Sequence, residues 1–403
     1  MRAPRNLVFG TGQRLSLAGH ARVLGNRVLV VTDARLEREP VFAELVDSLG
    51  AAGLAVKVFS AVDPELPRSC VAAGVDGAAG FDADVIVGIG GGSCMDAAKL
   101  IALLLAHGGD LADYYGEFKV PGPVLPLIAM PTTAGTGSEV TPVAVVADPE
   151  RTLKVGIASP HLIPHTAICD PELTYTCPPA LTAVSGADAL THAIEAYTTI
   201  TREATPALGH EHVFVGKNAL SDGFALSAIR HIGTSLRRAY DDGDDREARG
   251  HLMYGAMLAG LAFGVAGTSA AHAVQYPVGA LTHTAHGAGV AVMLPYVMEF
   301  NRPYCTTALA QIADALGVAR PDASDDANAR SAINHVTAIC AAIGIPDTLE
   351  KLGLKRDQLE WTATNAMGAS RLVKNNPRPL DAHSMSLLVN AAFAGDGSGL
   401  HPA

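Results

Sequence analysis

The pattern of apolar residues along the chain changes at the pair Pro178-Pro179, and this change limits the possible folds more than any other feature. Before the pair, short β-branched runs alternate with amphipathic or loop stretches, which is typical of a parallel sheet wound with helices. After it, long helical patterns such as 180–199 and 221–240 follow one another without strand signals. The sequence therefore predicts an α/β domain over residues 1–178 and an all-helical domain over residues 179–403.

The predicted strands are short and apolar on both faces, which is expected when helices cover a sheet on both sides. They comprise residues 27–32, 55–60, 84–90, 126–131 and 143–147. Two polar stretches, 241–247 and 320–328, are predicted to be solvated loops.

Composition narrows the class of protein. A chain of 403 residues suits two or three domains with a large core. Its net charge of −11, without a basic run, argues against nucleic acid or an anionic membrane surface as the main partner. Six scattered cysteines form no CxxC motif, and the first residues contain no apolar signal core. We therefore expect free thiols and a location in the reducing cytoplasm.

Residues 252–271 contain no charge and are long enough to cross a bilayer. This run is rich in Gly and Ala rather than Leu and Ile, and the charge-free stretch continues through three histidines as far as Glu299. We therefore expect a closely packed internal helix that leads to His272, and no membrane partner.

Four side chains in the second half of the chain suit a divalent-metal site. Asp188 and His192 are four residues apart, so a helix would place both over one face. His272 and His286 are fourteen residues apart, a spacing that lets a helix and the turn after it each present one imidazole. One carboxylate and three imidazoles suit Zn²⁺ or Fe²⁺. Spacing alone leaves an alternative, in which Asp188 caps a helix and the histidines are satisfied polar groups in an alanine-rich core.

A glycine-rich turn follows the predicted strand 84–90 and leads into a helical pattern. Its residues are Gly90, Gly91, Gly92 and Ser93. Glycines at such a turn let backbone N–H groups approach a pyrophosphate, and the start of the helix adds a partial positive charge. A plain tight turn is the alternative.

Two other positions extend this nucleotide-binding prediction. Thr132, Thr133 and Ser138 lie in a glycine-rich loop after strand 126–131, where hydroxyl groups suit a ribose or a phosphate. Asp33 follows strand 27–32, where a carboxylate would accept ribose hydroxyls and repel a 2′-phosphate. Capping of the next helix is an equal and compatible reading of Asp33.

Several separated motifs resemble, in the same order, those of the iron-containing, or group III, alcohol dehydrogenases. They are GGGSCMDAAK (90–99), PTTAGTGSEVT (131–141), GADALTHAIEAY (186–197) and the pair His272 and His286 in HAVQYPVGALTHTAHG. The resemblance runs from about residue 7 to NNPRP at 375–379. Agreement of several motifs in order is more specific than any one of them, and it favours the metal site over the alternative.

The resemblance implies an architecture like that of dehydroquinate synthase, with a Rossmann-like dinucleotide-binding domain, an all-α metal-binding domain and an active site in the cleft between them. Asp188, His192, His272 and His286 would be the metal ligands. The residues that would bind the dinucleotide are Gly90, Gly91, Gly92, Ser93, Asp96, Thr132, Thr133, Ser138 and Lys154, with an exposed strand lysine as the alternative for Lys154. Asp33 matches the acidic position that favours NAD over NADP, and homodimers or larger assemblies are common in the family.

The sequence departs from the family at one position. Many relatives have a further histidine four residues after the first ligand of the HA motif, where this chain has Tyr276. Tyr276 would take over a catalytic proton-relay role only with a lowered pKa, and His283 lies near it in sequence. Packing, or support of a metal ligand from behind, is the alternative for both.

The expected function is therefore hydride transfer between NAD(H) and a small alcohol, diol or hydroxy acid, with Fe²⁺, or alternatively Zn²⁺, in the site. A lyase like dehydroquinate synthase would need a cluster of Lys and Arg, and residues 180–300 are poor in them. An enzyme like maleylacetate reductase tends to lack the full ligand set. A non-catalytic NAD-binding protein would not need four intact ligands.

Overall fold

The computed structural model describes residues 1–151 and 153–400, which form two compact units. The first comprises residues 1–177 together with the short segment 209–213, and the second comprises residues 178–208 and the chain from Phe214 onward. A single boundary near residue 178 was expected. The segment 209–213, which overlaps the short helix α6 (Leu208–Glu211), nevertheless belongs to the first unit. Each unit is described by itself below.

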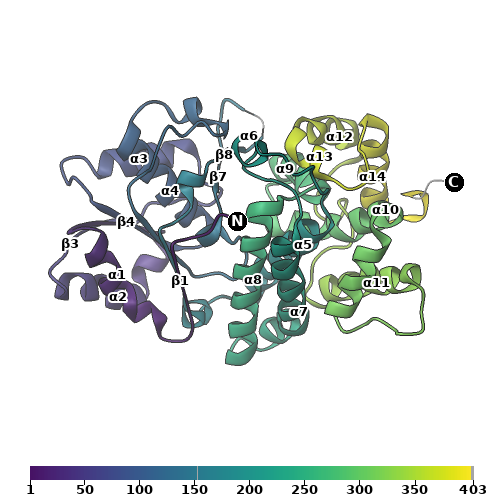
Figure 1. Cartoon of the computed structure of the whole chain (residues 1–403), viewed down its shortest axis with the longest axis horizontal. Coiled ribbons are helices and arrows are strands. Elements are labelled where there is room, and N and C mark those ends of the chain that lie inside the picture. The colour runs from purple at the N-terminus through teal and green to yellow at the C-terminus, as the bar shows by residue number, and fades with distance from the viewer. Residues whose placement is uncertain (152, 401–403) are drawn as a thin grey trace. The chain divides into compact units, whose positions relative to one another are not determined.

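The first unit contains a six-stranded parallel sheet in the order β1-β9-β6-β4-β2-β3. Strands β1, β3 and β4 of this sheet are labelled in Figure 1. The strands are β1 (Asn6–Phe9), β2 (Arg27–Val31), β3 (Ala55–Phe59), β4 (Val85–Gly90), β6 (Leu127–Pro131) and β9 (Thr166–Cys169). Four of them match predicted strands, and the parallel, Rossmann-like sheet is confirmed. The strands β2, β4 and β6 are neighbours, so the segments that follow them meet at one edge of the sheet.

Helices cover both faces of this sheet. Alternate residues of β2 point to opposite sides: Leu29 and Val31 pack with α3 (Arg68–Gly77) and α4 (Gly92–His107), whereas Val28 and Val30 pack with α1 (Leu17–Leu24) and α2 (Pro40–Ala51). This double coverage explains why the central strands read as continuous apolar runs. The described residues of the unit also form six 3₁₀ helices: η1 (Gln13–Ser16), η2 (Leu36–Arg38), η3 (Leu111–Tyr114), η4 (Ser138–Val140), η5 (Pro160–Leu162) and η6 (Pro171–Thr174).

The predicted strand 143–147 belongs to a second, smaller sheet. It forms β7 (Val143–Val146), which pairs antiparallel with β8 (Val155–Ala158), and β8 pairs parallel with β5 (Gly116–Glu117). The apolar residues of 143–147 were therefore enough to predict a strand. They did not show that the strand pairs with β8, outside the main sheet.

The second unit is helical, and its described residues contain only an isolated bridge between Thr201 and Gly216 besides helices, turns and loops. The helices are α5 (Pro179–Thr198), α7 (Ala219–Asp241), α8 (Arg246–Ala266), α9 (Ala270–Thr282), α10 (His286–Ala315), α11 (Asp325–Ala342), α12 (Leu359–Gly368), α13 (Ser370–Asn375) and α14 (Ala382–Ala394), with η7 (Arg356–Gln358) and η8 (Ser398–Leu400). The predicted loop 320–328 is shorter than expected, because the Ser324 side chain caps α11 and the helix starts at Asp325.

The charge-free run 252–271 is not one helix, which corrects the prediction. It is divided between α8 and α9, which are bent by 102° across the break. Gly267 follows α8 with φ of +82°, a conformation that favours glycine and ends the helix. Among the described residues no single helix is long and apolar enough to cross a membrane, although the bent pair α8 and α9 meets that test by length and composition.

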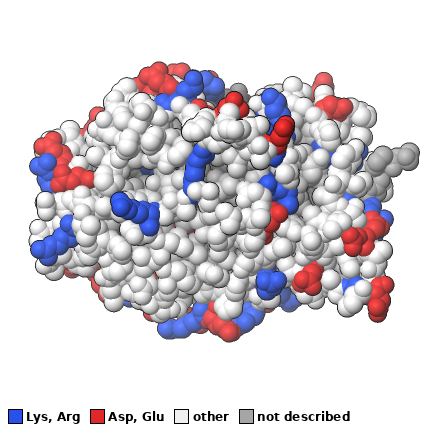
Figure 2. Space-filling model, viewed as in Figure 1, with Lys and Arg blue, Asp and Glu red and all other residues white. Residues whose placement is uncertain are grey.

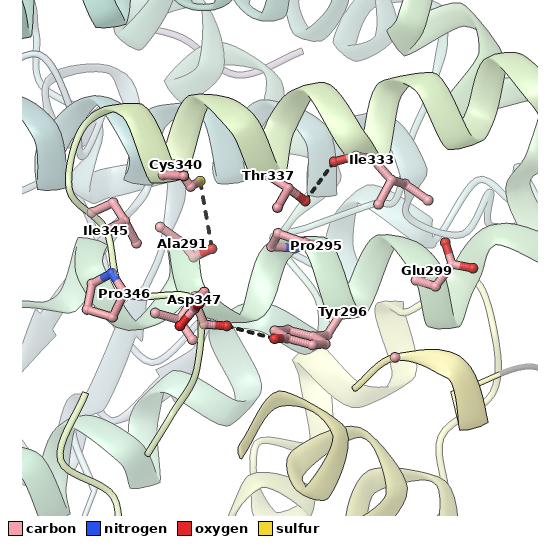
Figure 3. Close-up of a pocket in the computed structure, with 13 residues that line it drawn as sticks. Ala291, Pro295, Tyr296, Glu299, Ile333, Thr337, Cys340, Ile345, Pro346 and Asp347 are labelled. Atoms are coloured by element: carbon pink, nitrogen blue, oxygen red, sulfur yellow. Dashed lines mark hydrogen bonds between the residues drawn. The ribbon is translucent and has the colours of Figure 1, made fainter. Parts of the chain in front are cut away.

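Surface charge is mixed on the face drawn in Figure 2, where the Lys and Arg side chains of the described residues are interspersed with Asp and Glu. They do not gather into one broad basic area on that face. A separate feature of the second unit is an apolar cavity of about 220 Å³ beside α10 and α11 (Figure 3). The Tyr296 hydroxyl donates to the Asp347 carbonyl at its edge. None of the described residues that line it is a predicted metal ligand.

Candidate functional site

Helix α5 places three chemically active side chains on one buried face. Asp188, His192 and Glu195 follow one another at intervals of four and three residues, so they lie along a single stripe of the helix. All three are at most 5% exposed, because α5 packs against α7, α8 and α10. A buried carboxylate and imidazole on the same stripe require partners, and these come from α9 and α10.

The three predicted histidines converge on one oxygen of Asp188. Its Oδ1 atom lies 3.7 Å from Nε2 of His192, 3.7 Å from Nε2 of His272 and 3.8 Å from Nε2 of His286. These distances are too long for hydrogen bonds, but they suit atoms that share one cation with bonds of about 2.0–2.2 Å. Asp188, His272 and His286 offer ligand atoms that all lie within 4.8 Å of one another. His192 is not in that group, although its ring stacks on that of His272 at 4.7 Å.

Unpaired polar atoms mark the same place. Asp188 Oδ1 and His272 Nε2 are both buried and have no hydrogen-bond partner among the described residues. Buried polar atoms are nearly always paired, so two such atoms 3.7 Å apart suit a shared cation. The donor set, one carboxylate oxygen and three imidazole nitrogens, fits Fe²⁺ or Zn²⁺.

Glu195, which was not predicted, holds His272 in place. Its carboxylate accepts hydrogen bonds from the backbone N–H of Ser269 (3.0 Å) and Ala271 (2.7 Å), from the Ser269 hydroxyl (3.0 Å) and from Nδ1 of His272 (2.6 Å). The carboxylate of Glu195 can only accept in this contact, so Nδ1 of His272 is the donor and Nε2 is the ring nitrogen that would bind a cation beside Asp188. The position of Glu195, seven residues after Asp188, was a sequence signal that could have found it.

The pKa values of these groups reflect burial and their charged neighbours. Burial lowers the pKa of His192 to about 4, so its imidazole is neutral, as a metal ligand requires. Burial acts in the same direction on His272, but the carboxylates of Glu195 and Asp188 outweigh it and raise its pKa to about 9. Burial opposes ionisation of Asp188 as well, yet the surrounding histidines hold its pKa well below the usual range. Asp188 and Glu195 thus supply two negative charges beside the imidazoles, and a cation at Asp188 would take the place of the proton on Nε2 of His272.

Two glycines let the start of α10 approach the other helices closely. A Cβ atom on Gly287 would lie 2.0 Å from the carbonyl oxygen of Val184 in α5, and one on Gly289 would lie 1.5 Å from Oε1 of Gln275 in α9. His286, the first residue of α10, is thus brought beside Asp188 by backbone packing. Gln275 is buried, and its Oε1 atom has no hydrogen-bond partner among the described residues. Neither Gln275 nor this packing was predicted.

Tyr276 does not have the lowered pKa that a relay role would require. Its ring centroid lies 6.5 Å from that of His286, so it is near the candidate ligands. Burial raises its pKa, which favours the packing alternative over the relay role. His283 is exposed and has φ of +53° at the end of α9. Phe263, by contrast, stacks on the His192 ring at 4.1 Å and packs behind the site.

The predicted dinucleotide residues of the first unit also come together at one edge of the sheet. The backbone N–H of Thr132, after β6, donates to the carbonyl of Gly90 at the end of β4 (2.9 Å). Gly91 faces the Thr133 side chain, because a Cβ atom there would lie 3.7 Å from it. Two loops that are far apart in sequence are therefore adjacent.

The glycine-rich turn requires its glycines. Gly90 has φ of +149°, and a Cβ atom there would lie 2.5 Å from Sγ of Cys94. A Cβ atom on Gly92 would lie 2.7 Å from Cγ2 of Thr136. Helix α4 starts at Gly92, with Ser93 in its first turn, and no side chain caps it. The Cys94 N–H donates to the Gly91 carbonyl (3.1 Å), so the N–H groups of Gly92 and Ser93 are the candidates for another acceptor, such as a phosphate.

Asp33 has the capping role that was one of its two predicted roles, and its contact with a ribose stays a prediction. Its Oδ1 atom accepts from the backbone N–H of Arg35 (2.9 Å) and Leu36 (2.8 Å), which caps the turn after β2. Its Oδ2 atom lies 3.6 Å from Sγ of Cys94, on the side of Gly90. The second oxygen therefore faces the glycine-rich turn while the first is held by the backbone.

The remaining predicted residues contact other parts of the protein. Asp96 accepts from the Ser138 hydroxyl (2.6 Å) and from the backbone N–H of Val145 (2.9 Å). Lys154 forms an ion pair with Glu65 and is only partly exposed. Their contacts to a dinucleotide stay predictions.

Two family models together match most of the chain. Residues 4–171 match the model described as iron-containing alcohol dehydrogenase, and residues 182–393 match the C-terminal model of the Fe-containing alcohol dehydrogenase family.

Individual relatives agree with these models. The chain is 37% identical to long-chain-alcohol dehydrogenase 1 of Geobacillus thermodenitrificans, over 96% of this chain and 94% of that protein. It is 34% identical to the NAD-dependent methanol dehydrogenase of Bacillus methanolicus, over 97% and 98% of the two chains. The crystal structure of a 1,3-propanediol oxidoreductase superimposes with a TM-score of 0.91 at 32% identity and covers 97% of this chain and 99% of its own. The chain belongs to the iron-containing alcohol dehydrogenase family and is an alcohol dehydrogenase.

Proposed function

We propose that this enzyme transfers hydride between NAD(H) and a small alcohol, diol or hydroxy acid, and that a divalent cation, Fe²⁺ or alternatively Zn²⁺, is held by Asp188, His192, His272 and His286. The observation that carries the proposal is the convergence of three imidazole Nε2 atoms on Asp188 Oδ1, which is buried and unpaired. A cation bound there supplies Lewis acidity, which makes an alcohol more acidic and a carbonyl more electrophilic.

The chain's own residues prepare this chemistry. Glu195 fixes which ring nitrogen of His272 faces Asp188, and the low pKa of His192 keeps the His192 imidazole neutral. Phe263 packs on the His192 ring and limits its rotation. These contacts hold the donor atoms in place before any substrate arrives, which reduces the reorganisation needed for reaction.

NAD is proposed as the hydride carrier, in preference to NADP. The start of α4, which no side chain caps, and the adjacent loop at Thr132 suit a pyrophosphate. The Oδ2 atom of Asp33, which accepts from the Cys94 thiol, lies on the side of Gly90, and its negative charge would repel a 2′-phosphate. A relative that is 34% identical bears the name NAD-dependent methanol dehydrogenase, which supports the same choice. The relatives described above are dehydrogenases of alcohols and do not favour the lyase or maleylacetate reductase alternatives.

The test is the variant His272→Ala, with His383→Ala, an exposed histidine of α14, as the matched control. We expect His272→Ala to lose bound metal and turnover but to keep NADH binding. His272 belongs to the second unit, whereas the predicted dinucleotide loops belong to the first. His383→Ala should behave as the wild type. Full activity and full metal content in His272→Ala would falsify the assignment.

The substrate and the assembly need separate experiments. Oxidation of NADH by a panel of small aldehydes, ketones and oxo-acids, with protein reconstituted in turn with Fe²⁺ and Zn²⁺, would identify the substrate and the active metal. We also propose a homodimer or larger assembly in the cytoplasm, as the family resemblance implies. Sedimentation or light scattering of the purified protein tests the assembly, and a monomer under assay conditions would contradict it.

A further inference from the structure

Helix α4 contains a lysine that the proposed reaction does not use. Lys99 lies seven residues after Gly92, the first residue of the helix, and is 0% exposed. An ammonium group is costly to bury unless its donors are satisfied and its charge is balanced, so a fully buried lysine requires a specific set of partners.

The partners of Lys99 lie directly after the second predicted cofactor loop. Its Nζ atom donates to the carbonyl oxygens of Thr141 (3.0 Å) and Val143 (2.8 Å) and lies 3.4 Å from the Thr141 hydroxyl. Three acceptors match the three N–H donors of an ammonium group. Lys99 therefore attaches the end of the loop 131–141, and the first residue of β7, to α4.

Asp96, three residues earlier on the same face of α4, attaches the same segment at two more points. Its carboxylate accepts from the Ser138 hydroxyl (2.6 Å) and from the backbone N–H of Val145 (2.9 Å). Both Asp96 and the buried Glu139 lie close enough for their charges to act on Lys99. Burial nonetheless lowers the pKa of Lys99 to about 8, and it raises that of Glu139 to about 7. The cluster thus supplies both the hydrogen bonds and the opposing charge that Lys99 needs.

We infer that Lys99 is a positioning residue for the dinucleotide, because it fixes the loop 131–141 to the helix whose start would bind the pyrophosphate. The first loop is continuous with α4, and the second is tied to it by Lys99 and Asp96. The end of the second loop is therefore held by α4 side chains, in addition to the backbone contact of its start, Thr132, with the Gly90 carbonyl. This inference rests on the proposed NAD binding and adds to it a residue that does not touch the cofactor.

A purely stabilising role would predict a different result from a positioning role. If Lys99 only stabilises the first unit, its removal lowers the unfolding midpoint, while the folded variant binds NADH normally. If it positions the loop, the folded variant binds NADH weakly, although kcat at saturating cofactor and metal content change little, since the metal ligands lie in the second unit.

The experiment compares Lys99→Met with the wild type and with Lys57→Met, a partly buried lysine of β3 that serves as the control. The Kd for NADH is measured by fluorescence titration of the metal-loaded protein, together with kcat, metal content and thermal unfolding. We expect Lys99→Met to raise the Kd by roughly tenfold or more, because it removes buried charge-assisted hydrogen bonds. Lys57→Met should leave it unchanged. A folded Lys99→Met protein with a Kd within twofold of the wild type overturns the inference.

A second measurement needs no variant, in case Lys99→Met does not fold. In hydrogen exchange of the wild-type protein, peptides that cover 138–145 should exchange as slowly as those of α4, because the two are tied together. Exchange of 138–145 much faster than α4 would overturn the inference. Failure of the wild-type protein to bind NADH would instead overturn the proposed function, and this is determined before any variant is compared.

Discussion

Replacement of Glu195 by glutamine is the sharpest test of how the metal site is built. Glutamine has nearly the same shape, but one of its two terminal atoms is a donor. In the structure, one oxygen of Glu195 accepts from the Ser269 hydroxyl and the Ala271 N–H, and the other accepts from the Ser269 N–H and from Nδ1 of His272. In either orientation of the glutamine amide, its NH₂ group therefore faces two groups that are themselves hydrogen-bond donors.

The two orientations have different costs. If the amide nitrogen faces Ala271, the Ser269 hydroxyl can rotate to accept, but the Ala271 N–H loses its acceptor in a buried position. If the amide nitrogen faces His272, the imidazole can accept at Nδ1 only when its proton lies on Nε2. Nε2 then cannot bind a metal. The Ser269 N–H also loses its acceptor. Each unpaired buried group costs about 1–3 kcal/mol of unfolding free energy. Loss of such an outer carboxylate typically weakens metal binding about 10- to 100-fold.

The assay is competition for Fe²⁺ or Zn²⁺ with a chelator of known affinity, which gives a dissociation constant without any turnover. Glu247→Gln serves as the control, because this glutamate of α8 is exposed and pairs only with the surface residue Arg238 among the contacts described here. NADH binding should be unchanged in both variants. If Glu195→Gln bound metal within twofold of the wild type, the hydrogen bond from His272 would not control the ligand, and the reasoning would be refuted.

Three further predictions concern the first unit. Asp33→Ala should lower the preference for NAD over NADP by about tenfold or more, because it removes the charge that is proposed to lie near the ribose. The preference is measured as the ratio of the kcat/KM values for the two cofactors. An unchanged ratio would place the carboxylate away from the ribose. Gly90→Ala should destabilise the protein by about 1–3 kcal/mol in denaturant unfolding, because its φ is +149° and its Cβ would meet Cys94; equal stability would contradict this backbone conformation. Burial raises the pKa of Glu139 from 4.5 to about 7, so the folded protein keeps a proton that the unfolded chain releases. The unfolding free energy should therefore decrease between these pH values, by on the order of 3 kcal/mol, and Glu139→Gln should lack this decrease in unfolding experiments below and above the window.

The parts of the fold that local pattern determines were predictable. Strands β2 and β4 read clearly because both of their faces are buried and a polar residue or glycine ends each of them. Strand β1 (Asn6–Phe9) was not predicted, since it has four residues and only alternate ones are partly buried. It pairs with β9, about 160 residues later, so the information that makes it a strand lies far away in the sequence.

The site shows the same division between local and distant information. The spacing of Asp188 and His192 identified two side chains of one helix, and the same reasoning extended by one turn would have reached Glu195. The break at Gly267 was missed, because a charge-free run has no polar face from which to read a helix end. That Gln275 lies against Gly289 depends on how two helices pack, which no spacing along the chain encodes.

The lack of a side chain at Gly287 determines how closely α5 and α10 can pack. Since the carbonyl of Val184 occupies the place where a Cβ would be, α5 and α10 can neither come closer nor carry a larger residue without separating. The 3.8 Å between Nε2 of His286 and Oδ1 of Asp188 is therefore limited by a main-chain contact at a residue outside the four predicted ligands. A larger side chain at position 287 would be expected to move His286 away from Asp188 and so to weaken the proposed cation site, although all four predicted ligands would be unchanged.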